Sequence, residues 1–446
     1  MPHSRMNLPR GQPPCWAAGF LLLALFSPGC TGVSPSVPKT LNIWSAPRGV
    51  EEKGFLRLCR RFEQDHPGIE VRNLGGIDEY KLIRAIVAGA PPDLAYLYGT
   101  GEVGPLAANG ALAPLDEPYR QSGFRDEQFL PGIMAQHRYR GRLYAMPVTR
   151  DSMGLYWNRP AFREAGLDPD RPPRTLEETR SFAVRLTKRA IDGSLLRIGF
   201  NAVPDDPSAL LSAAGFRLLE EAPGRLRIDS PENVAALAWL VQLVDEMGGR
   251  TAMARLRSSF GRSDTAQNPL ATGKVAMEIN GEWISMHLEK YAPDTDYGIG
   301  EIPYPEGHPE RRNMAWSDGD VMIVPAEAPH GEMAWEFMRW MQQPRQQEEY
   351  AGVMNNLPSI RALLRSPVLT TGSRKRRTLG FILQTIAGSS RNVRYFPVLP
   401  VSRFYRETLI RAVEAAELHQ KTPAQALRDA QNRVQTALSR YGSGTD

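Results

Sequence analysis

The chain has 446 residues, of which 42% are apolar, and it carries 54 basic and 49 acidic side chains. This length and this apolar fraction are typical of a globular protein with two or three domain-sized units. The near balance of charge argues against a nucleic-acid partner, because proteins of that class carry a concentrated basic surface.

Residues 1–30 have the layout of an export signal. Two arginines and no acidic residue accompany an apolar run at 16–26, and the segment ends in SPGC. The run is too short to span a bilayer as a helix. The small residue before Cys30 predicts a lipoprotein signal, in which Cys30 becomes the lipid-modified first residue and residues 31–40 form a tether. Because the serine and proline of SPGC depart from the usual pattern, export without lipidation is the alternative.

Strand-like and helix-like patterns alternate after the tether. Strands are predicted at 40–45, 69–74 and 92–98, with helices at 51–64 and 78–88 between them. This alternation predicts an α/β fold in which helices cover a sheet. Ligands of such folds lie beyond the carboxyl ends of the strands, so aromatic residues at strand ends are candidates for a cleft.

Two later segments have sharper local signals. Val275–Ile279 reads as a buried strand, which an Asn280-Gly281 turn is predicted to end just before Trp283. Near the C-terminus, Thr422 and Gln425 have the spacing of a capping box and predict the start of a helix.

Several blocks of sequence carry a family resemblance through their order and spacing. They are FEQDHPGIEV, LIRAIVAGAPPDLAYL, NGALAPLDE, GRLYAMPVTRDSMGLYWNRPAFREAGLDP, GKVAMEINGEW and KTPAQALRDAQNRVQTAL. Together they span almost the whole mature chain, which resembles the bacterial extracellular solute-binding proteins of sugar-importing ABC transporters, the maltose-binding-like group. The resemblance implies a type II periplasmic-binding fold, in which two α/β lobes joined by hinge crossovers close around one ligand.

The resemblance also implies lobe boundaries and partners. Crossovers at PVTRDSMG and AWSDGDVMIV assign residues 41–148 and 318–355 to lobe one, and residues 151–314 and 356–446 to lobe two. The expected partners are a sugar, ABC permease subunits on separate chains and the membrane through the lipid anchor. The protein is expected to be a monomer without a cofactor, in the periplasm or at the outer face of the cytoplasmic membrane.

A buried sugar needs aromatic platforms for its C–H face and polar partners for its hydroxyls, because an unpaired buried hydroxyl costs about 1–3 kcal/mol. Four platforms and four polar partners are predicted: Trp44, Tyr98, Trp283 and Trp316, and Arg48, Glu102, Asp151 and Asp318. Trp283 is favoured over the other tryptophans because the matching family segment places an aromatic residue in the cleft. Asp151 occupies the crossover position where the resembling sugar binders carry a ligand-contacting acid.

Other functions fit the sequence less well. An anionic solute such as a glycerol phosphate or a sugar acid would use Arg48, Arg150 and Arg403, but the acids at 151, 318 and 320 would repel it. A ligand receptor for a sensor kinase would share the fold.

An enzyme is not expected. The sequence has no metal-ligand spacing, phosphate loop or nucleophile elbow. The acid pairs at 205–206 and 220–221 would suit a glycosidase, but adjacent side chains point apart and both pairs lie in predicted surface loops. The basic run RKRR at 374–377 is predicted to be a solvated helix end.

Overall fold

Two β-sheets organise the chain in the computed structural model, which describes residues 38–130, 132–201, 207–218, 226–354, 356–367 and 392–442. The predicted leader with Cys30, both acid pairs and the basic run lie outside these residues. No described helix is both long and apolar enough to cross a membrane.

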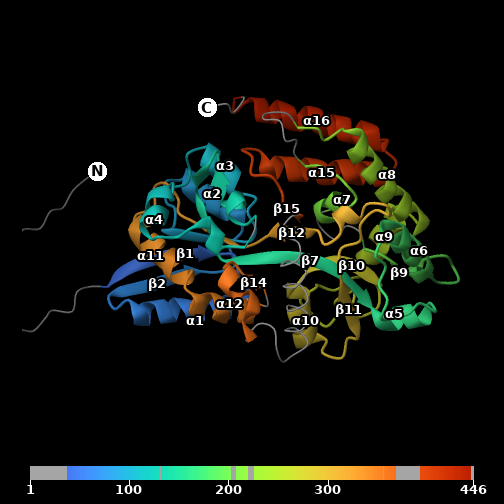
Figure 1. Cartoon of the computed structure of the whole chain (residues 1–446), viewed down its shortest axis with the longest axis horizontal. Helices are drawn as coiled ribbons and strands as arrows, with labels where there is room; N and C mark the ends of the chain where they lie inside the picture. Colours follow the sequence, from blue (N-terminus) through green and yellow to red (C-terminus); the bar gives the residue numbers. More distant parts are fainter. Residues whose placement is uncertain are drawn as a thin grey trace, which may run out of the picture. The chain divides into compact units, whose positions relative to one another are not determined.

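The first sheet is five-stranded, in the order β2-β1-β3-β13-β6. Its strands β1 and β2 are labelled in Figure 1. Its strands are β1 (Lys39–Ser45), β2 (Ile69–Leu74), β3 (Leu94–Leu97), β6 (Ala145–Pro147) and β13 (Val321–Ile323). The first three strands are parallel, whereas β13 runs antiparallel to both β3 and β6. A strand from late in the chain thus completes a sheet begun by the N-terminal part.

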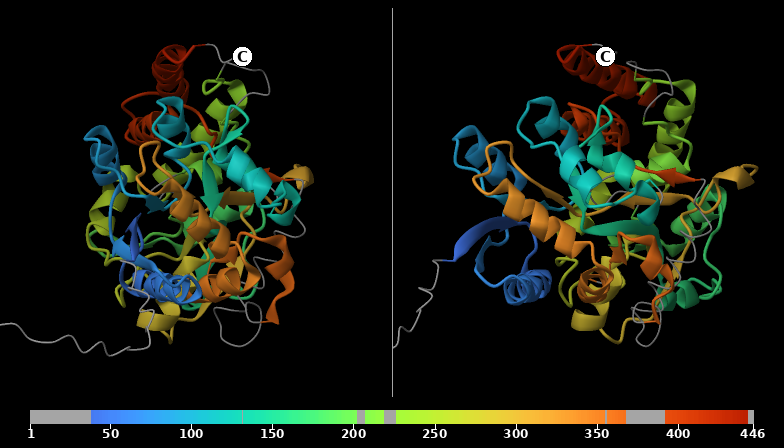
Figure 2. Two further views of the ribbon diagram at one scale, coloured as in Figure 1. Left: turned by 90° about the vertical axis from the view of Figure 1, so that its left-hand side faces the viewer. Right: turned by 60° about the vertical axis from the view of Figure 1, so that its left-hand side comes forward.

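Strand alternation divides the core of lobe one into two layers. Leu94 and Tyr96 of β3 face one layer, and Ala95 and Leu97 face the other. The first layer packs against α1 (Gly49–Asp65), α11 (Gly331–Met341) and α12 (Pro344–Met354), and the second against α2 (Glu79–Val87) and α3 (Val103–Ala108). Figure 2 shows α1 and α12 on the same side of the sheet.

The second sheet is six-stranded and is built around the ten-residue strand β7, with which four other strands pair. Its strands are β7 (Thr149–Asn158), β10 (Met277–Gly281), β11 (Tyr297–Gly300), β12 (Ala315–Asp318), β14 (Leu357–Pro358) and β15 (Val393–Arg394). The start of β7 pairs with β12 and β14, and its remainder pairs with β10 and β11. One continuous strand therefore connects the hinge to the sheet of lobe two.

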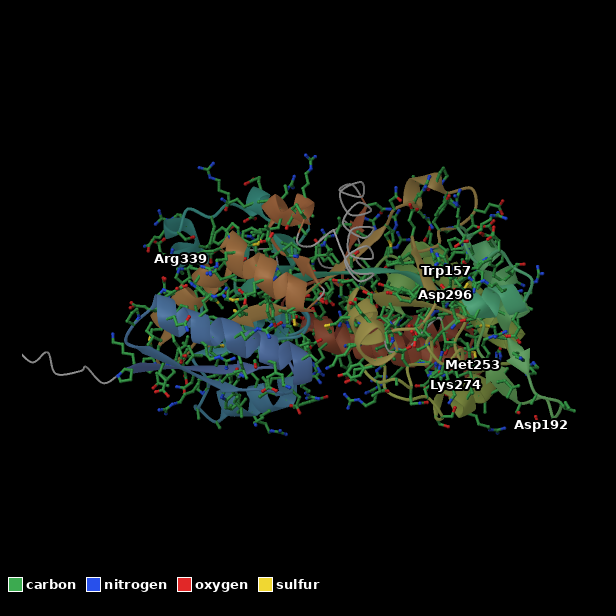
Figure 3. All side chains as sticks on the ribbon, turned by 90° about the horizontal axis from the view of Figure 1, so that it is seen from below. Trp157, Asp192, Met253, Lys274, Asp296 and Arg339 are labelled. Atoms are coloured by element: carbon green, nitrogen blue, oxygen red, sulfur yellow. The ribbon has the colours of Figure 1, made fainter. Side chains whose placement is uncertain are left out.

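Helices cover the second sheet, and all of them except α10, which packs in a smaller separate cluster, share its large apolar core. They are α5 (Arg159–Glu164), α6 (Leu176–Leu186), α7 (Ser208–Ala213), α8 (Pro231–Glu246), α9 (Arg250–Arg257), α10 (Trp283–Tyr291), α15 (Ser402–Glu417) and α16 (Pro423–Ser439). The capping box predicted at Thr422 is confirmed as the start of α16. In Figure 3, Arg339 lies toward the lobe-one end and Asp192 toward the lobe-two end.

Short elements complete the described chain: α4 (Asp116–Gln121), the ribbons β4 (Arg138–Tyr139) with β5 (Arg142–Leu143) and β8 (Lys188–Arg189) with β9 (Leu195–Arg197), and 3-10 turns at Asp126–Gln128, Met134–His137, Pro309–Arg311 and Arg361–Arg365.

Two predictions about local structure need correction. The Asn280-Gly281 turn is wrong, because both residues belong to β10 and pair with Gly154 and Met153 of β7. The boundary of lobe one at 355 also falls too early, because Leu357, Ile360 and Leu363 pack into its core. The other lobe boundaries stay predictions.

Candidate functional site

A cavity of about 530 Å³ lies between the two lobes. Lobe one contributes residues 48–51, at the start of α1, and Tyr98, which follows β3. Lobe two contributes residues 262–264 and the side of α10 that carries Met286, His287, Lys290 and Tyr291. This volume is within the usual range for small-molecule sites.

One face of α10 forms much of the lobe-two wall. Trp283, Met286, His287 and Lys290 are spaced i, i+3, i+4 and i+7 and therefore share that face. Trp283 is half-buried, and its ring lies over Gly281, where an added Cβ would come within 1.9 Å of it. Its ring is absent from the apolar clusters formed by the described residues. Trp283 itself is not among the residues that line the cavity, so its role as a platform stays a prediction.

His287 adds a polar group to the same wall. Burial lowers the pKa of its imidazole, which favours the neutral form near pH 7. Its Nδ1 is buried and has no hydrogen-bond partner among the residues the structure describes. A neutral imidazole offers one donor and one acceptor, which is the combination that a hydroxyl group also offers.

The charges of the lobe-one wall are held by partners within that lobe. The hydroxyl of Tyr98 donates to Glu51, and Arg48 Nη2 donates to the Gly76 carbonyl at 3.1 Å. Burial raises the pKa of the Glu51 carboxyl. Tyr98 remains 43% exposed, so its ring is accessible for stacking.

The lobe-two wall also carries an ion pair. Arg262 donates through Nε and Nη2 to the two carboxylate oxygens of Asp264, both at 2.8 Å. The hydrogen bonds from Arg262 lower the pKa of Asp264. This bidentate arrangement keeps both charges in place and leaves that part of the wall close to neutral.

Asp151 and Asp318 face each other in the register of β7 and β12, at the hinge. Asp151 accepts a hydrogen bond from Asn356 at 2.8 Å, and Asp318 accepts from the Thr100 backbone N–H at 3.2 Å. Burial, followed by the charge of Asp320, raises the pKa of Asp151. Both carboxyls are half-buried, neither lines the cavity described above, and their ligand roles stay predictions.

Two further carboxyls are buried beside the hinge. Asp320 accepts a hydrogen bond from Tyr96 at 2.7 Å, and Glu282 accepts one from the Ser152 backbone N–H at 2.9 Å and another from Leu357 N–H at 3.4 Å. Burial raises the pKa of Asp320 to about 7 and that of Glu282 to about 8. Glu282 thereby connects the start of α10 to two of the crossing strands.

Arg150 does not serve the anion-binding role considered for it. It is fully buried, and none of its three guanidinium nitrogens has a hydrogen-bond partner in the described part of the chain. Burial lowers its pKa to about 10, opposed by the charge of Glu282. Because alternation along β7 turns it away from the side chain of Asp151, it is no donor for a ligand in the cleft.

Two other tryptophans differ from Trp283. Trp316 is only 3% exposed and packs into the core of lobe two, so the prediction that it is a platform is wrong. Its place in β12 directs the ring into the core, as strand alternation requires. Trp44 is half-buried against lobe one, with Lys81 Nζ 5.7 Å from its ring centroid, and its platform role stays a prediction.

Glu102 has a partner outside the cavity. Its carboxylate accepts a hydrogen bond from Arg403 of α15 at 3.1 Å, and burial is the main cause of its raised pKa. It is 8% exposed and does not line the cavity. A role as a hydroxyl partner would require Arg403 to move.

The sequence reasoning missed most of the lobe-two wall. Met286, His287 and Lys290 follow Trp283 at helical spacing, which is the signal that identifies them once the helix is recognised. The wrong turn at Asn280-Gly281 hid this signal. Arg262 and Asp264 come from an irregular segment, where no periodic pattern exists to place them.

Comparison with known proteins identifies the family. Residues 57–373 match the family described as bacterial extracellular solute-binding protein. The chain belongs to this family. As such, it is the solute-binding component of an ABC transporter, and the predicted family and fold class are confirmed.

Relatives of this solute-binding protein are named for two kinds of ligand, a glycerol phosphate and sugars. The sn-glycerol-3-phosphate-binding periplasmic protein UgpB of Salmonella typhimurium is 25% identical over 438 residues, covering 90% of this chain and 93% of its own. The structure of CpMnBP1 with mannotriose bound has 25% identity and a TM-score of 0.75, covering 88% of this chain and 99% of that one. Maltose-bound T. maritima MalE3, at 21% identity and a TM-score of 0.71, covers 90% and 100% and shows the same fold.

Proposed function

We propose that the interlobe cavity binds a sugar or a short oligosaccharide and that the protein presents it to a separate ABC permease. The observation that carries the proposal is the α10 face, where His287 and Lys290 line a cavity of about 530 Å³ and Trp283 lies one turn earlier on the same face. An aromatic ring suits the C–H face of a sugar, and the polar groups suit its hydroxyls.

The pairing of charges favours a neutral solute over an anion. Arg262 is held by Asp264, Arg48 by a backbone carbonyl and Lys290 Nζ by the Tyr291 hydroxyl at 2.9 Å. An anionic ligand would have to compete with these partners for the cations of the wall. A neutral sugar leaves the charge pairs intact, because its hydroxyls exchange hydrogen bonds without a net charge.

Binding is coupled to closure of the lobes in this proposal. A solute that contacts both walls stabilises the closed arrangement relative to the open one, and the equilibrium shifts toward the state the permease receives. The protein acts as a monomer in the periplasm or at the outer face of the cytoplasmic membrane, where acylated Cys30 would anchor it.

A titration at low and high salt separates the sugar from an anionic solute. Calorimetry with mannotriose is expected to give binding that changes by less than about twofold between the two salt conditions, because a neutral ligand is little screened. Binding of sn-glycerol 3-phosphate that weakens steeply with salt, with no response to mannotriose or maltose, would contradict the proposal.

The names of the UgpB relatives make a glycerol phosphate the second candidate solute. Its phosphate would have to be bound by Arg48 or Lys290 at the cavity wall, since Arg150 is buried. The titration at low and high salt decides between the sugar and the glycerol phosphate.

A further inference from the structure

A second set of contacts joins the lobes through residues that do not line the cavity. In Figure 1, α2, α3 and α15 lie above β7, whereas α1 and α10, which line the cavity, lie below it. Figure 2 shows the same arrangement from two other directions. The interlobe boundary therefore has a cavity between α1 and α10 on one side of β7, and α2, α3 and α15 on the other side (Figure 1).

Arg403, near the start of α15, contacts lobe one through its guanidinium group. Its Nη1 donates to Glu102 Oε1 at 3.1 Å, and its central carbon lies 4.0 Å from the ring centroid of Tyr80 on α2. Its Nε donates to Glu407 of the same helix at 3.1 Å, which holds the group in this orientation. A planar guanidinium suits such combined pairing and stacking, which an ammonium group could not reproduce.

The backbones of the two lobes also touch at this point. An added Cβ on Gly104 of α3 would lie 2.2 Å from the Leu399 carbonyl oxygen and 2.8 Å from its carbon. Both atoms belong to backbone, so no rotation of a side chain would relieve the contact. The close approach is independent of the charges, and it locates the same boundary between α3 and the segment that leads into α15.

We propose that Glu102, Arg403 and Tyr80 form an interlobe latch that holds this edge of the boundary together whether or not solute is present. The lobes then separate at the other edge, where α1 and α10 flank the cavity. By keeping the lobes near the arrangement that binds, the latch raises the apparent affinity, because that affinity scales with the population of the competent state.

The exposure of the pair is consistent with such a role. The side chains of Arg403 and Glu102 are 27% and 11% exposed, so the carboxylate is largely removed from water. A buried carboxylate without its cation is strongly unfavourable. In the latched arrangement the two groups satisfy each other, so the loss of either one favours states in which the edge is open and the other group is hydrated.

Charge exchange tests the latch directly. Glu102→Arg and Arg403→Glu are each expected to enlarge the radius of gyration of the solute-free protein in small-angle scattering and to weaken mannotriose binding about tenfold. The double exchange should restore affinity to within about threefold of the original. Gly104→Ala should open the same edge without any change of charge. Arg428→Glu, which alters an exposed residue of α16 that takes no part in these contacts, is the matched control and should change neither quantity.

Several results would overturn the latch. Unchanged scattering in both single exchanges would show that the pair does not hold the edge, and tighter binding would show that it opposes solute. Weaker binding that the double exchange fails to restore would mean that the side chains act separately, by contact with the solute. The affinity measurement rests on the proposed sugar, whereas the scattering measurement needs no solute, so a wrong solute leaves the latch testable. Thermal melts of each variant exclude a simple loss of folding.

Discussion

The two edges of the interlobe boundary use charged residues in opposite ways. At the cavity, the pairs Arg262–Asp264 and Tyr98–Glu51 each lie within one lobe. At the α3–α15 edge, Glu102 and Arg403 pair across the lobes. Pairs within a lobe survive any movement of the lobes, whereas pairs across them oppose separation. The comparison indicates one edge that opens to admit solute and one that stays together.

The largest effect is expected from Trp283→Ala at the cavity edge. Loss of a stacking platform should weaken mannotriose binding by about 2–4 kcal/mol in calorimetry, with little change in melting temperature. Trp316→Ala is the matched control, because that side chain lies in the core of lobe two. It should lower stability by about 3–5 kcal/mol and leave the affinity of the folded protein unchanged. If Trp283→Ala instead lowered the stability and left the affinity unchanged, Trp283 would be a packing residue.

A smaller effect is expected from the buried carboxyls between the two edges. Burial raises the pKa of Asp320 to about 7 and that of Glu282 to about 8, so the folded protein retains protons that the unfolded chain has already lost. Stability from these groups is therefore full below their ordinary pKa values and falls as pH rises to about 8.

Melting temperature should consequently fall between pH 5 and pH 8.5, by an amount measurable in a thermal scan. Asp320→Asn should flatten this profile, because an amide does not titrate and still accepts the hydrogen bond from Tyr96. A profile of unchanged slope in this variant would assign the pH dependence to other groups.

The smallest effect is expected from Arg262→Ala. The side chain is 77% exposed and its partner lies in the same lobe, so its loss should change stability and mannotriose affinity by less than about 1 kcal/mol. A clear contrast with Arg403→Glu would sharpen the difference between the edges. A large loss of affinity would instead show that Arg262 contacts the solute.

Local patterns predicted most of the fold. The strand at 69–74 and the cap at Thr422 depend on short-range periodicity and side-chain chemistry, and both were found at the expected residues. The Asn280-Gly281 dipeptide failed because its turn preference is weak beside the pairing of both residues with β7. Tertiary pairing outweighed local propensity at that point.

The site was less predictable because its contacts join distant segments. Exposure separates Trp283 from Trp316, yet one follows a strand and the other occupies one, and this position does not reveal which ring is buried. The partnership of Glu102 with Arg403 spans about 300 residues and depends on how the lobes meet, which no pattern within either segment encodes.

The place of β13 in the first sheet affects how the chain folds as it is made. In the described part of the chain, β6 joins the other strands of the sheet through β13 alone, and Val321–Ile323 of β13 are synthesised long after Ala145–Pro147. At usual rates of translation this interval is on the order of ten seconds or more. Lobe one cannot complete its sheet during that time. For a chain that begins with a predicted export signal, the strand order would delay folding while the N-terminal part is threaded through a translocation pore.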